Sequence, residues 1–375
     1  MEVISSFLTG AIIFIILLGP LMFVHELGHF LAAKHAGIRV EEFGMGFPPR
    51  AVVLAKRGET IYSLNWLPIG AFVRMTGEED PTDKRSFAAQ PKRWRFITLL
   101  AGPAANFAAA FVILFLAYFV FATRVTEGQY RIDSVATGSP AEQIGLLPGD
   151  VVISANGNDM AQRISQDGAA VTTVALKVQA IASIGKDMTL DVRRRGENGA
   201  QSVAQLTGRI PATANREAPL GVSLSLQAIK AERLLMSPGE ALVESVSDAG
   251  NVMVSMVRVP IDIIRGVMPL EQARPTGIVG ITNIGVQLFR QNEIQGLFPF
   301  IRFAGLISLI LGISNLLPIP ALDGGRIVFV LVEWIRRRRV DPVREQWVHA
   351  IGMIFLLALS AVIVVLDIIK PITLP

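Results

Sequence analysis

The fold of this chain is limited most by long apolar segments that recur from its first residues to its last. Residues 7–23, for example, contain no charged side chain. A helix that crosses a bilayer needs about 20 apolar residues. Hydrophobic residues make up 51% of the 375 positions and the mean hydropathy is +0.49, values that exclude an ordinary soluble protein. We expect transmembrane helices over residues 1–36, 95–123, 298–338 and 345–370.

The basic residues gather beside these segments, so the net charge of +4 indicates a lipid bilayer as partner and no nucleic acid. The loops after the first and third apolar segments are rich in Lys and Arg, which predicts that both are cytoplasmic. The region between the second and third segments is then extracytoplasmic, as are both termini. No Lys or Arg precedes the first apolar run, so we expect a retained helix rather than a cleaved signal peptide.

Three ionisable residues occur within five positions near the end of the first apolar segment: His25, Glu26 and His29. Histidines four positions apart lie on one face of a helix, where both imidazoles can bind one tetrahedral zinc. A carboxylate beside the first ligand can deprotonate a bound water. The chain has no cysteine, so any metal must use His and carboxylate. The alternative is a chance motif with His25 as a core histidine, but ionisable groups are costly inside an apolar segment.

A second acidic site lies far down the chain, at Asp323. Two prolines and two glycines around it must interrupt the helix at membrane depth, and irregular backbone there must be buried in protein or line a wet cavity. Asp323 is either an N-cap for a helix over residues 324–336 or a third metal ligand, and the two roles can coexist. The interrupting residues are Pro318, Pro320, Gly324 and Gly325.

Residues 37–94 form a polar region on the cytoplasmic side. Apolar and polar side chains alternate over residues 50–55 and 60–66, which predicts a membrane-associated β-hairpin. Glycines and prolines on both sides of it predict loops. These residues are Gly44, Gly46, Pro48 and Pro49 before the hairpin, and Pro68 and Gly70 after it.

Residues 124–212 have the character of a water-soluble β-rich domain. A short helix opening at residues 138–141 is followed by Gly145-Leu146-Leu147-Pro148-Gly149-Asp150-Val151-Val152-Ile153 and the turn Asn156-Gly157. This order resembles a bacterial PDZ domain, which binds peptides by adding a strand to its sheet edge. A generic turn-rich sandwich is the alternative.

Residues 213–297 are expected to hold a strand over residues 220–226 and an amphipathic helix over residues 239–267. The helix lies either on the membrane surface or against the PDZ-like domain, and the surface position is favoured. Pro260 should kink or divide it.

Taken together, the motifs resemble the site-2 protease family of intramembrane zinc proteases, in particular its bacterial branch known as regulator of sigma-E protease. Nearly the whole chain takes part in the resemblance, apart from a single PDZ-like domain where better-known relatives carry two. The motifs are His25-Glu26-Leu27-Gly28-His29, Gly44-Met45-Gly46-Phe47, Leu67-Pro68-Ile69-Gly70-Ala71-Phe72-Val73 with Gly77-Glu78, Gly102-Pro103 with Asn106, and Asn315-Leu316-Leu317-Pro318-Ile319-Pro320-Ala321-Leu322-Asp323-Gly324-Gly325.

The resemblance implies one zinc ion bound by His25, His29 and Asp323, with Glu26 as the catalytic base. It also implies that Asn315 and the β-region at Gly44 and Gly46 contact the substrate. The substrates would be single-pass membrane proteins, such as anti-sigma factors already trimmed by another protease, or remnant signal peptides. The chain would cleave them in the bacterial plasma membrane, in regulated intramembrane proteolysis.

Two other functions fit parts of the sequence. A non-catalytic membrane adaptor would use the PDZ-like domain to bind extracytoplasmic tails and would need neither zinc nor Glu26. A transporter would use the broken third helix, but it should show an internal repeat, which the sequence lacks. We therefore expect a polytopic α-helical membrane protein with four transmembrane helices, a membrane-associated β-hairpin region and an inserted β-rich PDZ domain.

Overall fold

The computed structural model describes residues 2–78, 80–160, 162–163, 173–195, 201–266, 276–290 and 292–369. The chain divides into two compact units. The helical unit comprises Met1–Val120, Leu235–Arg290 and Leu297–Thr373. The β unit comprises chiefly Phe121–Leu234, with the short segment Gln291–Gly296.

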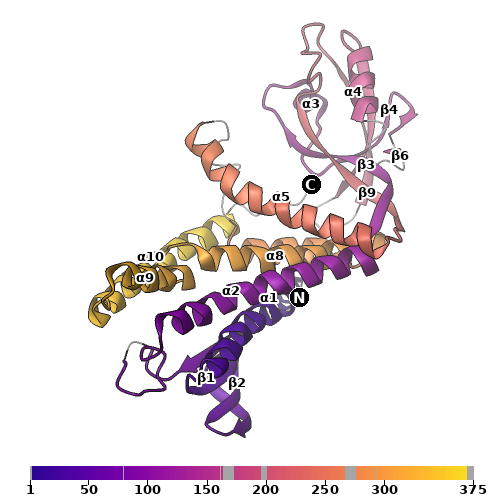
Figure 1. Ribbon diagram of the computed structural model, residues 1–375. Coiled ribbons are helices and arrows are strands. Elements are labelled where there is room, and N and C mark those ends of the chain that lie inside the picture. Colours follow the sequence, from indigo (N-terminus) through magenta and orange to yellow (C-terminus); the bar gives the residue numbers. More distant parts are fainter. Residues whose placement is uncertain are drawn as a thin grey trace. The chain divides into compact units, whose positions relative to one another are not determined.

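The helical unit is built around α2, which packs between α1 and α8 (Figure 1). A π-helical turn over Ala117–Phe121 extends α2 at its C-terminal end. The helices of this unit are α1 (Glu2–His35), α2 (Lys92–Leu116), α5 (Pro238–Ile264), α6 (Ile278–Arg290), α8 (Phe298–Leu316), α9 (Asp323–Arg336) and α10 (Pro342–Ile369).

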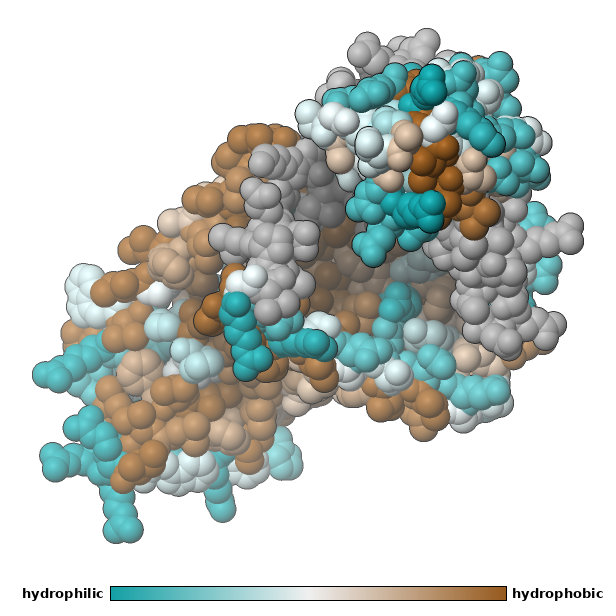
Figure 2. All heavy atoms as spheres, turned by 90° about the horizontal axis from the view of Figure 1, so that it is seen from above, coloured by the Kyte–Doolittle hydropathy of each residue, from teal (hydrophilic) through white to brown (hydrophobic). Residues whose placement is uncertain are grey.

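Within the described residues, four helices are long and apolar enough to cross a membrane: α1, α2, α8 and α10. These helices carry exposed hydrophobic side chains, and the face of the molecule seen in Figure 2 has extensive brown, hydrophobic surface. On α10, for instance, Ile354 is 68% exposed. Such faces would be unfavourable in water and suit contact with lipid, so the chain is an integral membrane protein. The third apolar segment is interrupted as expected, because α8 ends at Leu316 and α9 begins at Asp323.

The polar region after α1 forms two long antiparallel strands, β1 (Val40–Arg57) and β2 (Thr60–Met75), which confirms a hairpin here. The loops expected around it are wrong, since all six of their glycines and prolines lie inside the strands. Gly46 and Gly70 have φ angles of +79° and +80°, and the pairing register shifts near them. Glycine accepts such angles, so the strands bend at these points instead of ending.

This bending lets one stretch of β1 pair on both sides. Residues 42–45 face residues 71–74 of β2 on one side and residues 61–64 on the other. The stretch over residues 71–75 is therefore an outer strand of the sheet, and β2 packs against α1.

The β unit contains a seven-stranded sheet in the order β6-β3-β4-β7-β8, with β5 beside β4 and β9 beside β3. The PDZ-like domain was predicted to end at residue 212. In the structure, the whole of β9 pairs with β3, so the sheet extends to Arg233. The elements are β3 (Thr123–Val135), α3 (Pro140–Ile144), β4 (Val151–Ala155), β5 (Asn158–Asp159), β6 (Gln162–Arg163), α4 (Thr173–Ala182), β7 (Asp187–Arg195), β8 (Gln201–Arg209), β9 (Val222–Arg233) and α7 (Asn292–Gln295).

Local sequence explains two turns of this unit. Ser139 caps α3, because its side chain accepts a hydrogen bond from the backbone N–H of Glu142. Asn156 and Gly157 both have positive φ, as a tight hairpin turn between β4 and β5 requires. The core is apolar and includes Ile132, Val152 and Leu190, each fully buried.

Helix α5 contains an internal proline and makes a charged contact with α8. Pro260 was expected to kink or divide this helix; the helix continues through Pro260, so it is not divided there. A proline removes one backbone donor, which an exposed helix can tolerate. Near its middle, Asp248 accepts two hydrogen bonds from Arg302 on α8 and one from the Tyr118 hydroxyl. This charged contact attaches α5 to α8 and to the turn that extends α2.

A buried ion pair joins α2 to α9. Arg95 donates to Glu333 at 2.6 Å, and the two side chains are only 5% and 1% exposed. The second carboxylate oxygen of Glu333 accepts from the backbone N–H of Val340 at 3.2 Å. Glu333 therefore connects α2, α9 and the end of the loop that leads to α10.

Replacing Glu333 by alanine should destabilise the fold, because the Arg95 charge would remain buried without its partner. Loss of one member of a buried pair costs about 3–5 kcal/mol. The measurement is thermal unfolding in detergent, with Arg336→Ala as control, since Arg336 is an exposed cation on the same helix. Equal melting temperatures for the two variants would contradict a structural role for the pair.

Candidate metal centre

Three side chains from two distant parts of the chain meet inside the helical unit. The Nε2 atoms of His25 and His29 lie 3.1 and 3.2 Å from Oδ2 of Asp323. The two Nε2 atoms lie 3.2 Å from each other. Among the described residues, these three form a group of side chains whose spacing could hold a metal ion. The structure thus brings together the three residues that the sequence indicated as ligands.

The spacing of the three donor atoms fits tetrahedral zinc. Zinc bonds of about 2.0–2.1 Å at tetrahedral angles place ligand atoms about 3.3 Å apart. The observed separations of 3.1–3.2 Å are close to that value. Oδ2 of Asp323 is fully buried and has no hydrogen-bond donor among the described residues, as expected for an oxygen that serves a cation. Two nitrogens and one oxygen leave a fourth position open.

The second nitrogen of each imidazole is held by α2. Nδ1 of His29 lies 2.7 Å from the backbone oxygen of Thr98, to which it donates. Nδ1 of His25 lies 3.1 Å from the side-chain amide of Asn106. The nitrogen and oxygen of an amide can be interchanged, and with Oδ1 facing the ring Asn106 accepts the Nδ1–H of His25. Both imidazoles then present Nε2 to the metal, the usual support for a histidine ligand.

Two glycines allow α1 and α2 to approach closely enough for these contacts. A Cβ atom on Gly28 would lie 2.3 Å from the backbone oxygen of Ala101, and one on Gly102 would lie 2.3 Å from Nε2 of His29. No real side chain tolerates either separation. The glycine inside the His-Glu-x-x-His run and the glycine of the Gly102-Pro103 motif are therefore required by packing.

Glu26 lies between the histidines on α1 and contacts the sheet. Its Oε2 accepts a hydrogen bond from the backbone N–H of Val73 at 3.1 Å. Val73 is opposite Phe43 in the pairing register. Because its N–H donates to Glu26, that N–H points away from β1 and toward the carboxylate. The outer edge of β2 thus lies beside the carboxylate that the sequence indicated as a catalytic base.

The expected N-cap role of Asp323 is not observed. Asp323 is the first residue of α9, Leu322 occupies the cap position, and no side chain caps the helix. The carboxylate turns toward the two histidines instead. Gly324 and Gly325 lie so close to the carbonyls of Leu317 and Ile319 that a Cβ atom would clash, which brings the start of α9 against the broken segment.

Asn315, Gly44 and Gly46, the residues expected to contact the substrate, lie on α8 and on β1. The side-chain amide of Asn315 donates to the backbone oxygen of Leu311 in its own helix. Gly44 packs against Phe72, and Gly46 bends β1 toward the backbone of Leu67.

A charged cluster stabilises the sheet beside the centre. Glu42 is 3% exposed and accepts two hydrogen bonds from Arg50 and one from Ser63. The Arg50 guanidinium, helped by Ser63, holds the pKa of the Glu42 carboxyl below its ordinary value. The carboxylate therefore stays charged at neutral pH and ties together three parts of the sheet.

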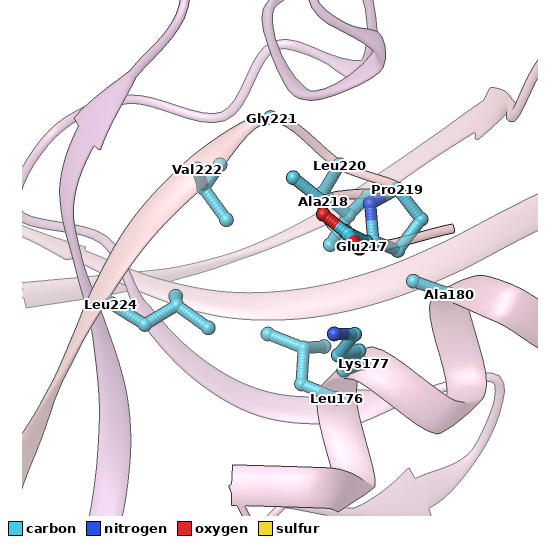
Figure 3. Close-up of a pocket in the computed structure, with 10 residues that line it drawn as sticks. All are labelled: Leu176, Lys177, Ala180, Glu217, Ala218, Pro219, Leu220, Gly221, Val222 and Leu224. Carbon is cyan, nitrogen blue, oxygen red and sulfur yellow. The ribbon is translucent and has the colours of Figure 1, made fainter. Parts of the chain in front are cut away.

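The β unit holds a separate groove, between α4 and the start of β9 (Figure 3). Val222 and Leu224 on β9 point toward Leu176 on α4 in this view. In the part of the chain that the structure describes, β9 is paired along one edge, with β3. Lys177 and Glu217 add one charge of each sign to the lining.

Sequence reasoning missed several contacts of the centre. The backbone groups of Thr98 and Val73 leave no signal in residue type. His349 was also missed, although it is one of only four histidines in the chain and lies in an apolar segment, where an ionisable group is costly. That cost is a signal that could have identified it.

Replacing Gly102 by alanine should weaken metal binding by roughly 10- to 100-fold, because the new methyl group would displace the His29 imidazole. Metal affinity in detergent, measured by competition with a chromophoric chelator, tests this. Gly250→Ala is the control, since nothing lies within 4 Å of a Cβ atom at that helical glycine. Equal affinities in the two variants would show that His29 is not held as described.

Comparison with known proteins agrees with this geometry. The model of peptidase family M50 matches residues 13–359. A candidate zinc metalloprotease of Clostridium perfringens is 30% identical over 353 residues, covering 94% of this chain and 96% of the relative. The zinc metalloprotease RasP of Shouchella clausii is 29% identical over 443 residues, covering 95% and 98%. A candidate zinc metalloprotease of a Nostoc species is 30% identical over 360 residues, covering 94% and 93%. The chain therefore belongs to peptidase family M50, the site-2 protease family that its motifs indicated.

Proposed function

We propose that this peptidase is a zinc enzyme that cleaves single-pass membrane proteins within the bilayer. His25, His29 and Asp323 bind the zinc ion, and Glu26 is the catalytic base. The observation that carries the proposal is the set of three donor atoms 3.1–3.2 Å apart, on the apolar helix α1 and at the start of α9, next to Glu26. The names of the relatives as zinc metalloproteases support the choice of metal.

When bound by these three residues, a zinc ion would supply Lewis-acid chemistry that makes water nucleophilic near neutral pH and polarises a carbonyl. Glu26 takes the proton of the attacking water and delivers it to the leaving amine. The hydrogen bond from Val73 fixes one oxygen of the carboxylate, so the other is free for this transfer. Thr98 and Asn106 orient the histidines and keep their Nε2 atoms toward the metal.

A substrate helix must unwind before its peptide bond can react, because its carbonyls are already hydrogen-bonded within the helix. The outer edge of β2 over residues 71–75 is suited to receive the unwound segment as an added strand. Its backbone groups would replace the lost hydrogen bonds next to Glu26. Gly44 and Gly46 shape this sheet, and we propose that Asn315 exchanges its bond with Leu311 for one with the substrate backbone.

The β unit supplies a second binding surface in this proposal. We assign it as an extracytoplasmic PDZ domain whose groove between α4 and β9 accepts a peptide as an added strand. It would dock trimmed substrates, such as anti-sigma factors already cut by another protease or remnant signal peptides, and exclude bulky ectodomains. The basic loops after α1 and α9 would then face the cytoplasm of a bacterial cell, with the helices in its plasma membrane. A purely adaptor function is disfavoured, because the chain belongs to a peptidase family.

Replacing Glu26 by glutamine should abolish cleavage while zinc remains bound, because Glu26 is not among the ligands. Loss of general-base catalysis lowers rates by roughly 10²–10⁴-fold or more. Zinc content and cleavage of a single-pass substrate are measured on the same preparation. The control is Glu41→Gln, a carboxylate that contacts Thr76 away from the centre. Zinc loss in Glu26→Gln, or cleavage at the control rate, would count against the assignment.

Removal of the β unit should raise cleavage of untrimmed substrates relative to trimmed ones, if this unit selects by size. The deletion is feasible because its ends meet: the N–H of Leu234 donates to the oxygen of Ala122 at 2.9 Å. A short linker can therefore replace residues 123–233. The measurement is the ratio of the two cleavage rates in vesicles. An unchanged ratio would rule out the selective role and leave the catalytic proposal intact.

A further inference from the structure

His349 on α10 makes a specific contact with the broken segment that precedes Asp323. Its Nδ1 accepts a hydrogen bond from the backbone N–H of Ala321 at 2.9 Å. Three residues later on the same helix face, Gly352 packs against Pro320 so closely that a Cβ atom would lie 2.4 Å from that ring. One face of α10 therefore holds the segment between α8 and α9.

The residue that His349 holds has an unusual backbone. Ala321 has a φ angle of +77°, in the left-handed region that favours glycine. It lies two positions before Asp323, so its conformation decides where α9 starts and where the carboxylate points. A hydrogen bond to its N–H is a direct way to stabilise this conformation against the extended alternatives that alanine prefers.

The chemistry of His349 fits this contact better than general packing. Because Nδ1 accepts a hydrogen bond, it carries no proton, and the neutral ring has its proton on Nε2. Nε2 is buried and has no partner among the described residues. The ring also lies 5.3 Å from the ring of Phe329 on α9. A purely apolar side chain would fill this place without leaving a buried donor unpaired, so the acceptor at Nδ1 is the feature that requires histidine.

We propose that His349 is a positioning residue for the metal ligand Asp323, acting through the backbone of Ala321. The inference rests on the proposed function, since it takes Asp323 as a ligand. His349 contacts neither the metal site nor a substrate; it fixes the segment from which the ligand extends. Such supporting contacts commonly contribute a factor of roughly 10–100 in metal affinity.

Two substitutions separate the hydrogen bond from the ring. His349→Asn places an amide oxygen near the position of Nδ1 and removes the ring. His349→Phe keeps a ring against Phe329 and removes the acceptor. The control is His35→Phe, since His35 is an exposed histidine that also contacts an aromatic ring, that of Trp94. If His349→Phe does not fold, His349→Met, which also lacks an acceptor, takes its place.

The readouts are zinc affinity by chelator competition, the visible absorption spectrum of the cobalt-substituted protein, and the melting temperature. His349→Phe should lower zinc affinity roughly 10- to 100-fold and change the cobalt spectrum. His349→Asn should stay within about threefold of wild type, and the control should match wild type. Adding Ala321→Gly to His349→Phe should recover much of the lost affinity, because glycine adopts a positive φ without strain.

The outcomes distinguish this inference from the proposed function. Wild-type affinity in His349→Phe, with zinc lost in Asp323→Ala, would overturn the positioning role and leave the metal site standing. Zinc retained in Asp323→Ala would overturn the ligand assignment itself. Equal losses in His349→Asn and His349→Phe, without recovery by Ala321→Gly, would show that His349 acts through ring packing alone.

Discussion

The structure depends on one constraint: polar groups placed inside apolar helices must find partners within the protein. The metal centre meets this constraint through the close contact of α1 and α2. Gly28 and Gly102 remove the side chains that would separate these helices. The Thr98 carbonyl then reaches His29, and Asn106 reaches His25. In hydrocarbon an unpaired imidazole nitrogen would be costly, so the same contacts that orient the ligands also make them tolerable there. The contacts that pack α1 against α2 are therefore the same contacts that orient the metal ligands.

How much of this could be predicted from the sequence depends on whether the determinant is local. His25, Glu26 and His29 are fixed relative to one another by helix geometry, and the broken segment around Asp323 is marked by its prolines and glycines. Both were recognisable without a structure. The backbone of Val73 and Thr98 was not, because every residue carries an N–H and a carbonyl, and only tertiary packing selects which ones reach the site. The loop prediction around Gly46 and Gly70 failed for a related reason, since a glycine signals a permitted angle and not whether a strand stops or bends there.

The sheet next to the centre links two requirements of cleavage inside a membrane. Its outer strand offers backbone groups to a chain that has lost its helical hydrogen bonds, and its Val73 N–H also contacts Glu26. A substrate strand bound at this edge would therefore lie beside the base. The ion pair between buried Glu42 and exposed Arg50 matters here because a two-stranded sheet alone is marginally stable. Glu42 also pairs with Arg74 on the outer strand, so these charged contacts help to hold the edge in place.

The segment between α8 and α9 shows how an irregular backbone can be maintained at such a site. A left-handed alanine costs about 1–2 kcal/mol, and a single hydrogen bond returns about 0.5–1.5 kcal/mol. The contact between Ala321 and His349 is thus of the right size to offset the strain, and no larger. Strained backbone persists where its surroundings fix it, and here they include Gly324, Gly325 and Gly352, each packed against the segment. The direction of the Asp323 carboxylate therefore depends on all of these contacts together. No single residue of the motif around Asp323 explains it.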